Sequence, residues 1–228
     1  MSDLVDLTSL KSLFGPIRDQ GMRPTCLAFA ASDAHAALRN GWSPLSCEYV
    51  FYQAQKHAGR PPSTGASLPS TLEALRTSGQ PEEVGWPYLP ATPSANETWE
   101  PPNSIRELFF RKSRLSTPKV DGIIAELDQG RPVIILLMLS SSFFRPSGKG
   151  IVDEVPGELP EPQRRHAVVA LGHGTIDGQR AVLIRNSWGA SWGEYGNGWL
   201  TEQFLNPRIF AAAVLTEEVY VPADSTTA

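Results

Sequence analysis

Cysteine is scarce in this chain of 228 residues, which contains only Cys26 and Cys47. Two cysteines form at most one disulfide, whereas small secreted proteins that depend on disulfides carry a dense framework of them. The sequence therefore excludes that class of protein. The simpler interpretation is that both cysteines are free thiols in a reducing compartment.

Long hydrophobic runs are also absent. The apolar stretch from Val133 to Leu139 is much shorter than the roughly 18 residues that a membrane-spanning helix needs, so it predicts a buried strand. Residues 1–7 have neither the basic patch nor the apolar region of a secretory signal. If Met1 is the natural start, we expect a cytoplasmic protein with no membrane partner.

The charge of the chain is low and nearly balanced. Charged residues make up 19% of the chain, hydrophobic residues 41%, and the formal net charge is -4. These values are ordinary for a globular protein and give no reason to expect nucleic acid as a partner. The cysteines and histidines lack the spacing of a metal site, and no phosphate-binding loop or dinucleotide fingerprint is present. We therefore expect no metal and no cofactor.

The two halves of the chain differ in their expected secondary structure. Alanine-rich and amphipathic segments predict helices in the first half, with Thr25 and Ser46 as N-caps of the first two. Beyond a proline-rich loop at 80–103, apolar runs between glycine and proline turns predict mainly strands. Helices are expected over 26–39, 47–55, 69–77, 104–112 and 121–129, and strands over 131–139, 150–155, 166–172, 180–185, 198–201 and 209–220. This order predicts the α+β class.

Cys26 is the first candidate for chemistry, because it opens a segment that predicts a buried helix. At a helix start, the free N–H groups and the positive end of the dipole favour the thiolate over the thiol. Gln20, six residues earlier, can offer its side-chain amide, and with the N–H of Cys26 it would supply two donors for an oxyanion. A small buried structural thiol is the alternative for Cys26, and it is the favoured interpretation of Cys47.

A thiolate nucleophile needs a base, and four histidines are present. His166 opens a predicted strand after a turn rich in proline and charge, where a reactive side chain is well placed. His173, seven residues later, points to the opposite face of an ideal strand. His35 and His57 are expected to be structural or exposed. A satisfied histidine at a strand end remains the alternative for His166.

The base in turn needs a group that orients it. Asn186 ends a predicted strand and is followed by a turn dense in glycine and tryptophan. Its amide can accept a hydrogen bond from one imidazole nitrogen, and the indole of Trp188 can shield that bond from water. An aromatic-rich loop that only packs against the core is the alternative.

Together, these segments resemble the papain (C1) family of cysteine peptidases. The family pattern is a glutamine six residues before a cysteine that heads a buried helix, then H-A-V, then N-S-W-G-x-x-W-G-x-x-G. Here it is matched by Gln20, Cys26, His166 and the stretch from Asn186 to Gly196. His166 lies 140 residues after Cys26, within the range typical of the family. The resemblance spans residues 16–220.

The resemblance implies a two-lobe α+β fold with the active site in the cleft between the lobes. Residues 1–110 would form the helical lobe with the nucleophile, and residues 111–228 an antiparallel, β-barrel-like lobe with the histidine and asparagine. Whether the N-terminal strand crosses to the β-rich lobe, and whether the C-terminal segment crosses back to the helical lobe, is left open. The implied activity is hydrolysis of peptide bonds through a thioester acyl-enzyme at Cys26, His166, Asn186 and Gln20.

The resemblance also implies how substrate is bound. Ala66 and Ser67 would lend backbone groups to an extended peptide or protein substrate, Leu68 would line a side-chain pocket, and Trp188 would cover the site. A peptide ligase on the same site, or a pseudo-peptidase that binds a peptide without cutting it, remains an alternative.

The sequence departs from the family pattern around the nucleophile. The usual C-G-S-C-W is replaced by Arg23-Pro24-Thr25-Cys26-Leu27, so the nearby disulfide cysteine is missing. The fifteen residues before Pro16 hold no inhibitory propeptide, and we therefore expect control by narrow specificity, localisation or a regulatory partner protein. Arg164 and Arg165 precede His166. We interpret them as solvated loop charges, with a preference for acidic substrates as the alternative.

Overall fold

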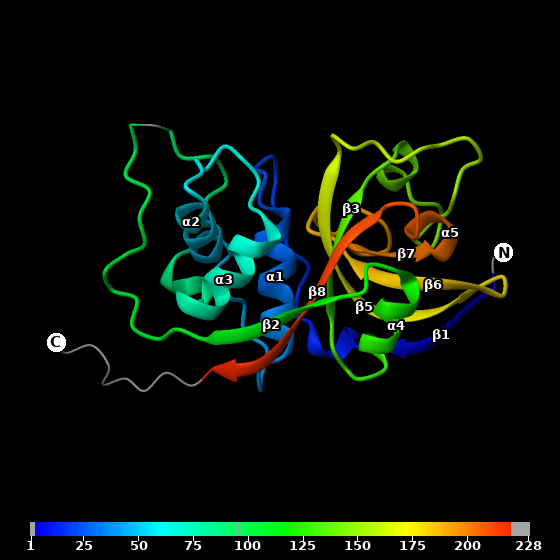
Figure 1. The fold of residues 1–228 in the computed structure, drawn as a ribbon, viewed down its shortest axis with the longest axis horizontal. Coiled ribbons are helices and arrows are strands. Elements are labelled where there is room, and N and C mark those ends of the chain that lie inside the picture. Colours follow the sequence, from blue (N-terminus) through cyan, green and yellow to red (C-terminus); the bar gives the residue numbers. More distant parts are fainter. Residues whose placement is uncertain (1–2, 95, 220–228) are drawn as a thin grey trace.

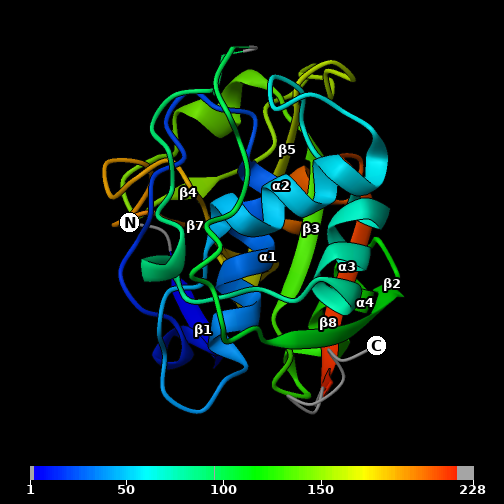
Figure 2. The same ribbon diagram turned by 90° about the vertical axis from the view of Figure 1, so that its left-hand side faces the viewer.

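The computed structural model describes residues 3–94 and 96–219, and it divides into a helical side and a sheet side (Figure 1). The helical side consists of α1 (Cys26–Ala37), α2 (Cys47–Ala58) and α3 (Leu68–Thr77). Seen from that side, α2 and α3 lie in front of α1, with strands of the sheet behind it (Figure 2). No described helix is both long enough and apolar enough to span a membrane.

The described strands form one sheet that contains residues from both halves of the chain. Its path runs β2-β8-β3-β5-β6-β7-β4, and β1 pairs with β5 beside this path. The strands are β1 (Leu4–Ser9), β2 (Phe110–Ser116), β3 (Val133–Met138), β4 (Ile151–Val152), β5 (Arg165–Ile176), β6 (Gln179–Arg185), β7 (Asn197–Thr201) and β8 (Ile209–Val219). Two helices, α4 (Val120–Leu127) and α5 (Glu202–Leu205), accompany the sheet, and three short 3-10 helices, η1 (Lys11–Leu13), η2 (Glu83–Gly85) and η3 (Ser141–Phe144), lie in the connecting segments.

This arrangement confirms the α+β class. The described pairs are antiparallel apart from the two-residue β4, which runs parallel to β7. The sheet does not close into a barrel, since its path begins at β2 and ends at β4. The division of the chain at residue 110 stays a prediction. β1 from the first half joins the sheet through β5.

The prediction of a helix over 104–112 is wrong. Phe110–Ser116 is instead the strand β2, which pairs with β8 from Phe110↔Val219 to Ser116↔Ala212. The buried Arg111 donates hydrogen bonds to the carbonyls of Leu38 and Thr216. The partners of this segment are about a hundred residues away in sequence, and such long-range pairing overrides local helix propensity.

Other boundaries also differ from the expectation. The strand expected over 150–155 shrinks to Ile151–Val152, β5 extends to Ile176, and β1 was not expected. The helices over 26–39, 47–55, 69–77 and 121–129 are confirmed within a few residues. Ser46 caps α2 by accepting from the Tyr49 N–H, as predicted. Tyr220, the expected end of the last strand, lies outside the described residues.

Helix α1 is the centre of the packing. Every residue from Leu27 to Ala37 is buried, so Cys26 is the one residue of the helix that keeps partial exposure. Alanine makes up much of the helix, and its small side chain lets α2, α3 and β5 approach closely. Thr25 occupies the N-cap position, but its hydroxyl bonds the Tyr88 hydroxyl at 2.8 Å instead of capping the helix. The predicted capping role of Thr25 is therefore wrong.

His35 lies in the interior of α1 and contributes a pH dependence to stability. Its Nδ1 is 3.0 Å from the Gln80 side-chain oxygen, and the residue is fully buried. Burial lowers the pKa of His35 from its ordinary 6.5 to about 3. The unfolded chain therefore binds a proton at a pH where the folded protein does not. It follows that stability is present above the unfolded pKa and is lost as the pH falls.

We expect the free energy of unfolding to fall by about 2 kcal/mol between pH 6.5 and pH 4.5 from His35 alone. Urea unfolding of the His35→Gln variant at these two pH values should show a loss that is smaller by that amount. His57→Gln, which removes an exposed imidazole, controls for the loss of a histidine as such. An equal pH dependence in the wild type and His35→Gln would contradict this role of His35.

Candidate active site

Two adjacent strands bring His166 and Asn186 together. His166 is the second residue of β5, Asn186 follows the last residue of β6, and these strands pair through Val169↔Arg185. The Nε2 of His166 lies 2.7 Å from the Oδ1 of Asn186. The Ser187 N–H donates to the same Oδ1 at 2.8 Å, which identifies this atom as the acceptor. His166 therefore carries its proton on Nε2 and keeps Nδ1 free to act as a base.

Cys26 lies at the start of α1, beside the start of β5. The backbone of Ala167, which follows His166, is within hydrogen-bonding reach of the Cys26 thiol. As the first residue of the helix, Cys26 has a backbone N–H with no carbonyl partner inside the helix. The fold thus brings a thiol, an orphan N–H group and the strand that carries His166 to one place.

Burial acts on both titratable groups of this site. It raises the pKa of the Cys26 thiol above its ordinary value, against hydrogen bonds from the backbone of Ala167, Leu27 and Cys26 itself. It also lowers the pKa of His166 to about 4, against the hydrogen bond with Asn186. Each group alone therefore favours its neutral form. Opposite charges on the two groups would offset this penalty, so they are expected to titrate as a coupled pair.

Gln20 is tied to the loop that follows Asn186. Its backbone N–H donates to the Ser187 carbonyl at 2.9 Å, and its Oε1 accepts from the Ser187 hydroxyl at 2.7 Å. Its Nε2 donates to the Arg23 carbonyl at 2.7 Å. These partners determine the orientation of the amide. They also leave the second hydrogen on Nε2 for another acceptor.

Trp188 packs against the imidazole of His166. Their ring centroids are 4.5 Å apart with a tilt of 35°. Phe143, which is fully buried, contacts both rings at 5.8 Å and 5.4 Å. This aromatic packing limits the access of water to the hydrogen bond between His166 and Asn186, which strengthens it.

Comparisons with known proteins identify the family of this chain. The model of the papain family cysteine protease matches residues 1–204. The chain belongs to the papain family. Among the curated relatives, Peptidase 1 of Dermatophagoides farinae is 29% identical over 202 residues, covering 86% of this chain and 59% of that protein. The Cysteine protease of Blomia tropicalis is 29% identical over 194 residues, covering 81% and 56%.

Solved structures show the same fold. Xylellain, a cysteine protease from Xylella fastidiosa, superimposes with a TM-score of 0.73 at 22% identity, covering 94% of this chain and 87% of that one. A structure from a study of the mite allergens Blo t 1 and Der p 1 gives a TM-score of 0.73 at 22% identity, covering 95% and 72%. This chain spans less than two thirds of the length of its curated mite relatives.

A buried ion pair that the sequence analysis missed holds the segments of this papain-family site together. Arg185 precedes Asn186 in the chain, and its Nε lies 2.7 Å from the Asp33 carboxylate in α1, with both side chains almost fully buried. The same guanidinium donates to the carbonyls of Gly15 and Pro16, which lead toward Gln20. One cation therefore links the segments that carry Asn186, Cys26 and Gln20.

A second buried ion pair replaces the cysteine that the papain family has near its nucleophile. Arg23 forms a two-pronged salt bridge with Glu48 of α2, and the exposed fractions of the side chains are 2% and 0%. Glu48 also accepts from the Leu89 N–H at 3.0 Å and the Trp99 indole at 2.7 Å. Sequence analysis missed this pair, although a carboxylate among the apolar residues of a buried helix face was its signal.

We expect Glu48→Gln to lower the free energy of unfolding by about 3 to 5 kcal/mol, because it leaves the Arg23 charge buried without a counterion. The exposed pair of Glu73 and Arg76 is the matched control, and Glu73→Gln should cost far less, because solvent screens an exposed pair. Urea unfolding of both variants at neutral pH measures the difference. Equal costs would show that the buried pair contributes no more than a surface pair.

The predicted substrate-binding segment, residues 66–68, lies next to the loop that precedes Cys26. A Cβ added at Gly65 would be 3.7 Å from the Pro24 carbonyl. Ala66 and Ser67 are half-buried, and Leu68 is buried in the cluster that includes Leu27. The Ser67 carbonyl already accepts from the Thr71 N–H and hydroxyl in α3, so its N–H is the backbone group left for a ligand. The substrate-binding roles of these residues stay predictions.

The remaining cysteine and histidines lie apart from this site. Cys47 and Cys26 are both free, and burial raises the pKa of Cys47 to about 12. His173 lies 2.7 Å from Asp128, while His57 is exposed near Ser78. Within 3–94 and 96–219, no group of three histidine, cysteine or acidic residues could hold a metal ion.

Proposed function

We propose that this chain is a cysteine peptidase that hydrolyses peptide bonds through Cys26, His166 and Asn186. The observation that carries the proposal is the hydrogen bond from His166 Nε2 to Asn186 Oδ1, which leaves Nδ1 as a free base on the strand beside Cys26. Membership of the papain family supports the same reaction. The roles of the individual residues are inferred from their geometry.

The first step of the proposed reaction is transfer of the Cys26 proton to His166. Burial disfavours each charge by itself, but a thiolate and an imidazolium that form together attract each other strongly where water is excluded. Asn186 stabilises the imidazolium because its Oδ1 accepts from Nε2. The thiolate then attacks the peptide carbonyl carbon and forms a carbon–sulfur bond.

The negative oxygen that this attack creates needs donors. The free N–H of Cys26 is one, and the unused hydrogen on the Gln20 amide is the other. Both donors are held in place before substrate binds, since Ser187 and Arg23 determine the orientation of Gln20. Such preorganised donors favour the transition state over the ground state.

The second half of the proposed reaction releases both products. The carbon–nitrogen bond breaks as the imidazolium of His166 gives its proton to the leaving amine, and the acyl group remains on Cys26 as a thioester. Water then loses a proton to His166 and attacks the thioester carbon. The carbon–sulfur bond breaks, the thiol regains its proton, and the fragment leaves with a new carboxyl group.

The proposed substrate is a peptide or protein in an extended conformation, bound along residues 66–68 with Trp188 covering the catalytic contact. A regulatory partner and a cytoplasmic location stay predictions from the sequence. The mass of the products distinguishes hydrolysis from ligation, because water or an amine resolves the same thioester. A pseudo-peptidase would form no thioester at all.

The proposal predicts that a peptidyl epoxide directed at thiolates modifies Cys26 and not Cys47, whose pKa burial raises to about 12. Mass mapping of the labelled protein measures this, and labelling should be lost in His166→Ala. Cys26→Ala should fold normally and show no turnover of peptides. Turnover by Cys26→Ala, free of contaminating protease, or equal modification of both cysteines would refute the proposal.

We expect Gln20→Ala to lower kcat by about 100-fold with little change in KM, because the oxyanion exists only in the transition state. Ser187→Ala is the matched variant: it removes the hydroxyl that holds Gln20 Oε1 but leaves the donor in place, so its loss should be smaller. Steady-state kinetics on one peptide substrate measures both. An unchanged kcat in Gln20→Ala would exclude this role.

A further inference from the structure

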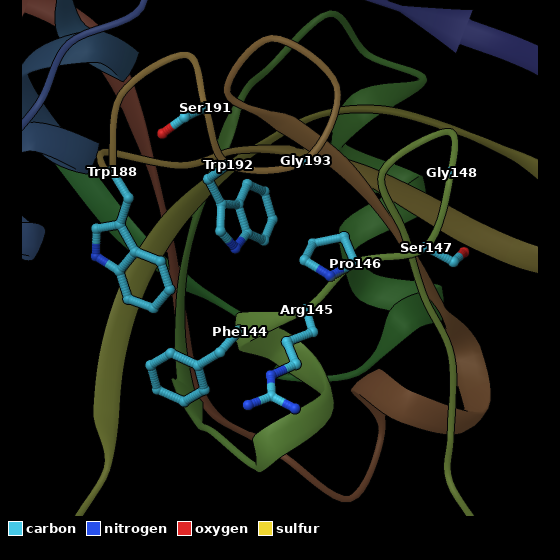
Figure 3. A pocket seen from close by; sticks show the side chains of 9 residues that line it. All are labelled: Phe144, Arg145, Pro146, Ser147, Gly148, Trp188, Ser191, Trp192 and Gly193. Carbon is cyan, nitrogen blue, oxygen red and sulfur yellow. The ribbon is translucent and has the colours of Figure 1, made fainter.

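An open hollow of about 490 Å³ lies beside the candidate active site (Figure 3). Phe144 and Trp188 stack with a centroid distance of 5.3 Å and form its aromatic side. In Figure 3, Pro146 and Ser147 lie on the other side, and the side chain of Arg145 extends toward Phe144. The remaining lining residues are Gly148, Ser191, Trp192 and Gly193.

The hollow shares a wall with the catalytic centre. Trp188 lines the hollow and also packs on the imidazole of His166. In the proposed reaction His166 gives a proton to the leaving amine, so the fragment that leaves must lie next to this imidazole. A peptide that continues past Trp188 therefore enters the hollow with the residues that follow the scissile bond.

Arg145 gives the hollow its charge. Within 3–94 and 96–219, no carboxylate lies within salt-bridge distance of the Arg145 guanidinium. Of the two arginines before His166, Arg164 pairs with Glu161 at 2.9 Å, and Arg165 donates to the Pro162 carbonyl.

Two further charges lie next to lining residues in the sequence. Lys149 follows Gly148, and Glu194 follows Gly193, and these two charges are opposite in sign. Among the residues that line the hollow, Arg145 is the one with a charged side chain. Its planar guanidinium matches the geometry of a carboxylate, and the stacked rings provide apolar surface for the rest of the residue that carries it.

We propose that this hollow is a specificity pocket for a carboxylate on the leaving side of the substrate, with Arg145 as the selecting residue. The proposal rests on the proposed peptidase function and adds a substrate class to it. Two kinds of group carry this chemistry: the side chain of an aspartate or glutamate after the scissile bond, and the terminal carboxylate of a peptide that ends there. The first would make the protein selective for acidic sequences, and the second would make it remove short C-terminal fragments.

The test compares internally quenched peptides that differ at one of the first three positions after the scissile bond. We expect kcat/KM to be about three- to tenfold higher for Asp or Glu than for Asn or Gln at the position that reaches Arg145. This preference should shrink at high salt, because the pair is partly exposed. Arg145→Gln should abolish the preference, and Arg145→Glu should turn it into a preference for Lys.

A second set of peptides distinguishes the two sources of carboxylate. These peptides end one, two or three residues after the scissile bond, either as the free acid or as the amide. Faster cleavage of the free acids, lost in Arg145→Gln, assigns the pocket to the terminal carboxylate. Arg106→Gln removes an exposed arginine that does not line the hollow, and it should leave both preferences unchanged.

The outcomes separate this proposal from the proposed function. Turnover with equal rates for Asp and Asn peptides, and also for free-acid and amide peptides, overturns the carboxylate pocket and leaves the peptidase intact. If no peptide is cleaved, the peptidase proposal fails, and the carboxylate pocket is then tested by measuring peptide binding. In that case an Asp-containing peptide amide should quench tryptophan fluorescence at lower concentration than its Asn counterpart, and only with Arg145 present. Equal binding of the two peptides overturns the proposal.

Discussion

The ion pair between Arg185 and Asp33 joins the segments on which the site depends. Cys26 is on α1, Asn186 follows β6, and Gln20 lies in an N-terminal segment with no regular structure of its own. Arg185 reaches Asp33 in α1 and two carbonyls of the N-terminal segment from one buried position. Because an unpaired charge in the interior is costly, this contact specifies one relative placement of three distant parts of the chain.

Near Cys26, an ion pair occupies the place where the papain family has a disulfide bond. Arg23 stands where the papain pattern has a disulfide cysteine, and its carbonyl holds the Gln20 amide while its guanidinium pairs with Glu48. Arg23 also packs over the ring of Tyr88 at 4.9 Å. A reducing environment does not break these noncovalent contacts of Arg23. The Gln20 side chain therefore keeps its support independently of the redox state.

The errors of the sequence analysis have one physical cause. Residues 104–112 favour a helix locally, but Phe110–Ser116 pairs with β8, which lies about a hundred residues later. Thr25 has the residue type of an N-cap, yet its hydroxyl bonds Tyr88 from the proline-rich loop. The pair of Arg23 and Glu48 and the position of Arg145 in a hollow escaped notice for the same reason. In each case the deciding partner is distant in the sequence.

The sequence by itself determined the α+β class and the buried helix headed by Cys26, and it predicted His166 and Asn186 as the groups to accompany that cysteine. These features depend on local chemistry: alanine spacing, a helix start, and a motif dense in tryptophan and glycine. Only the tertiary structure decided that the sheet stays open, that two buried ion pairs hold the site, and that Arg145 and Trp188 line the same hollow. Burial and pairing arise between distant residues, so no local pattern records them.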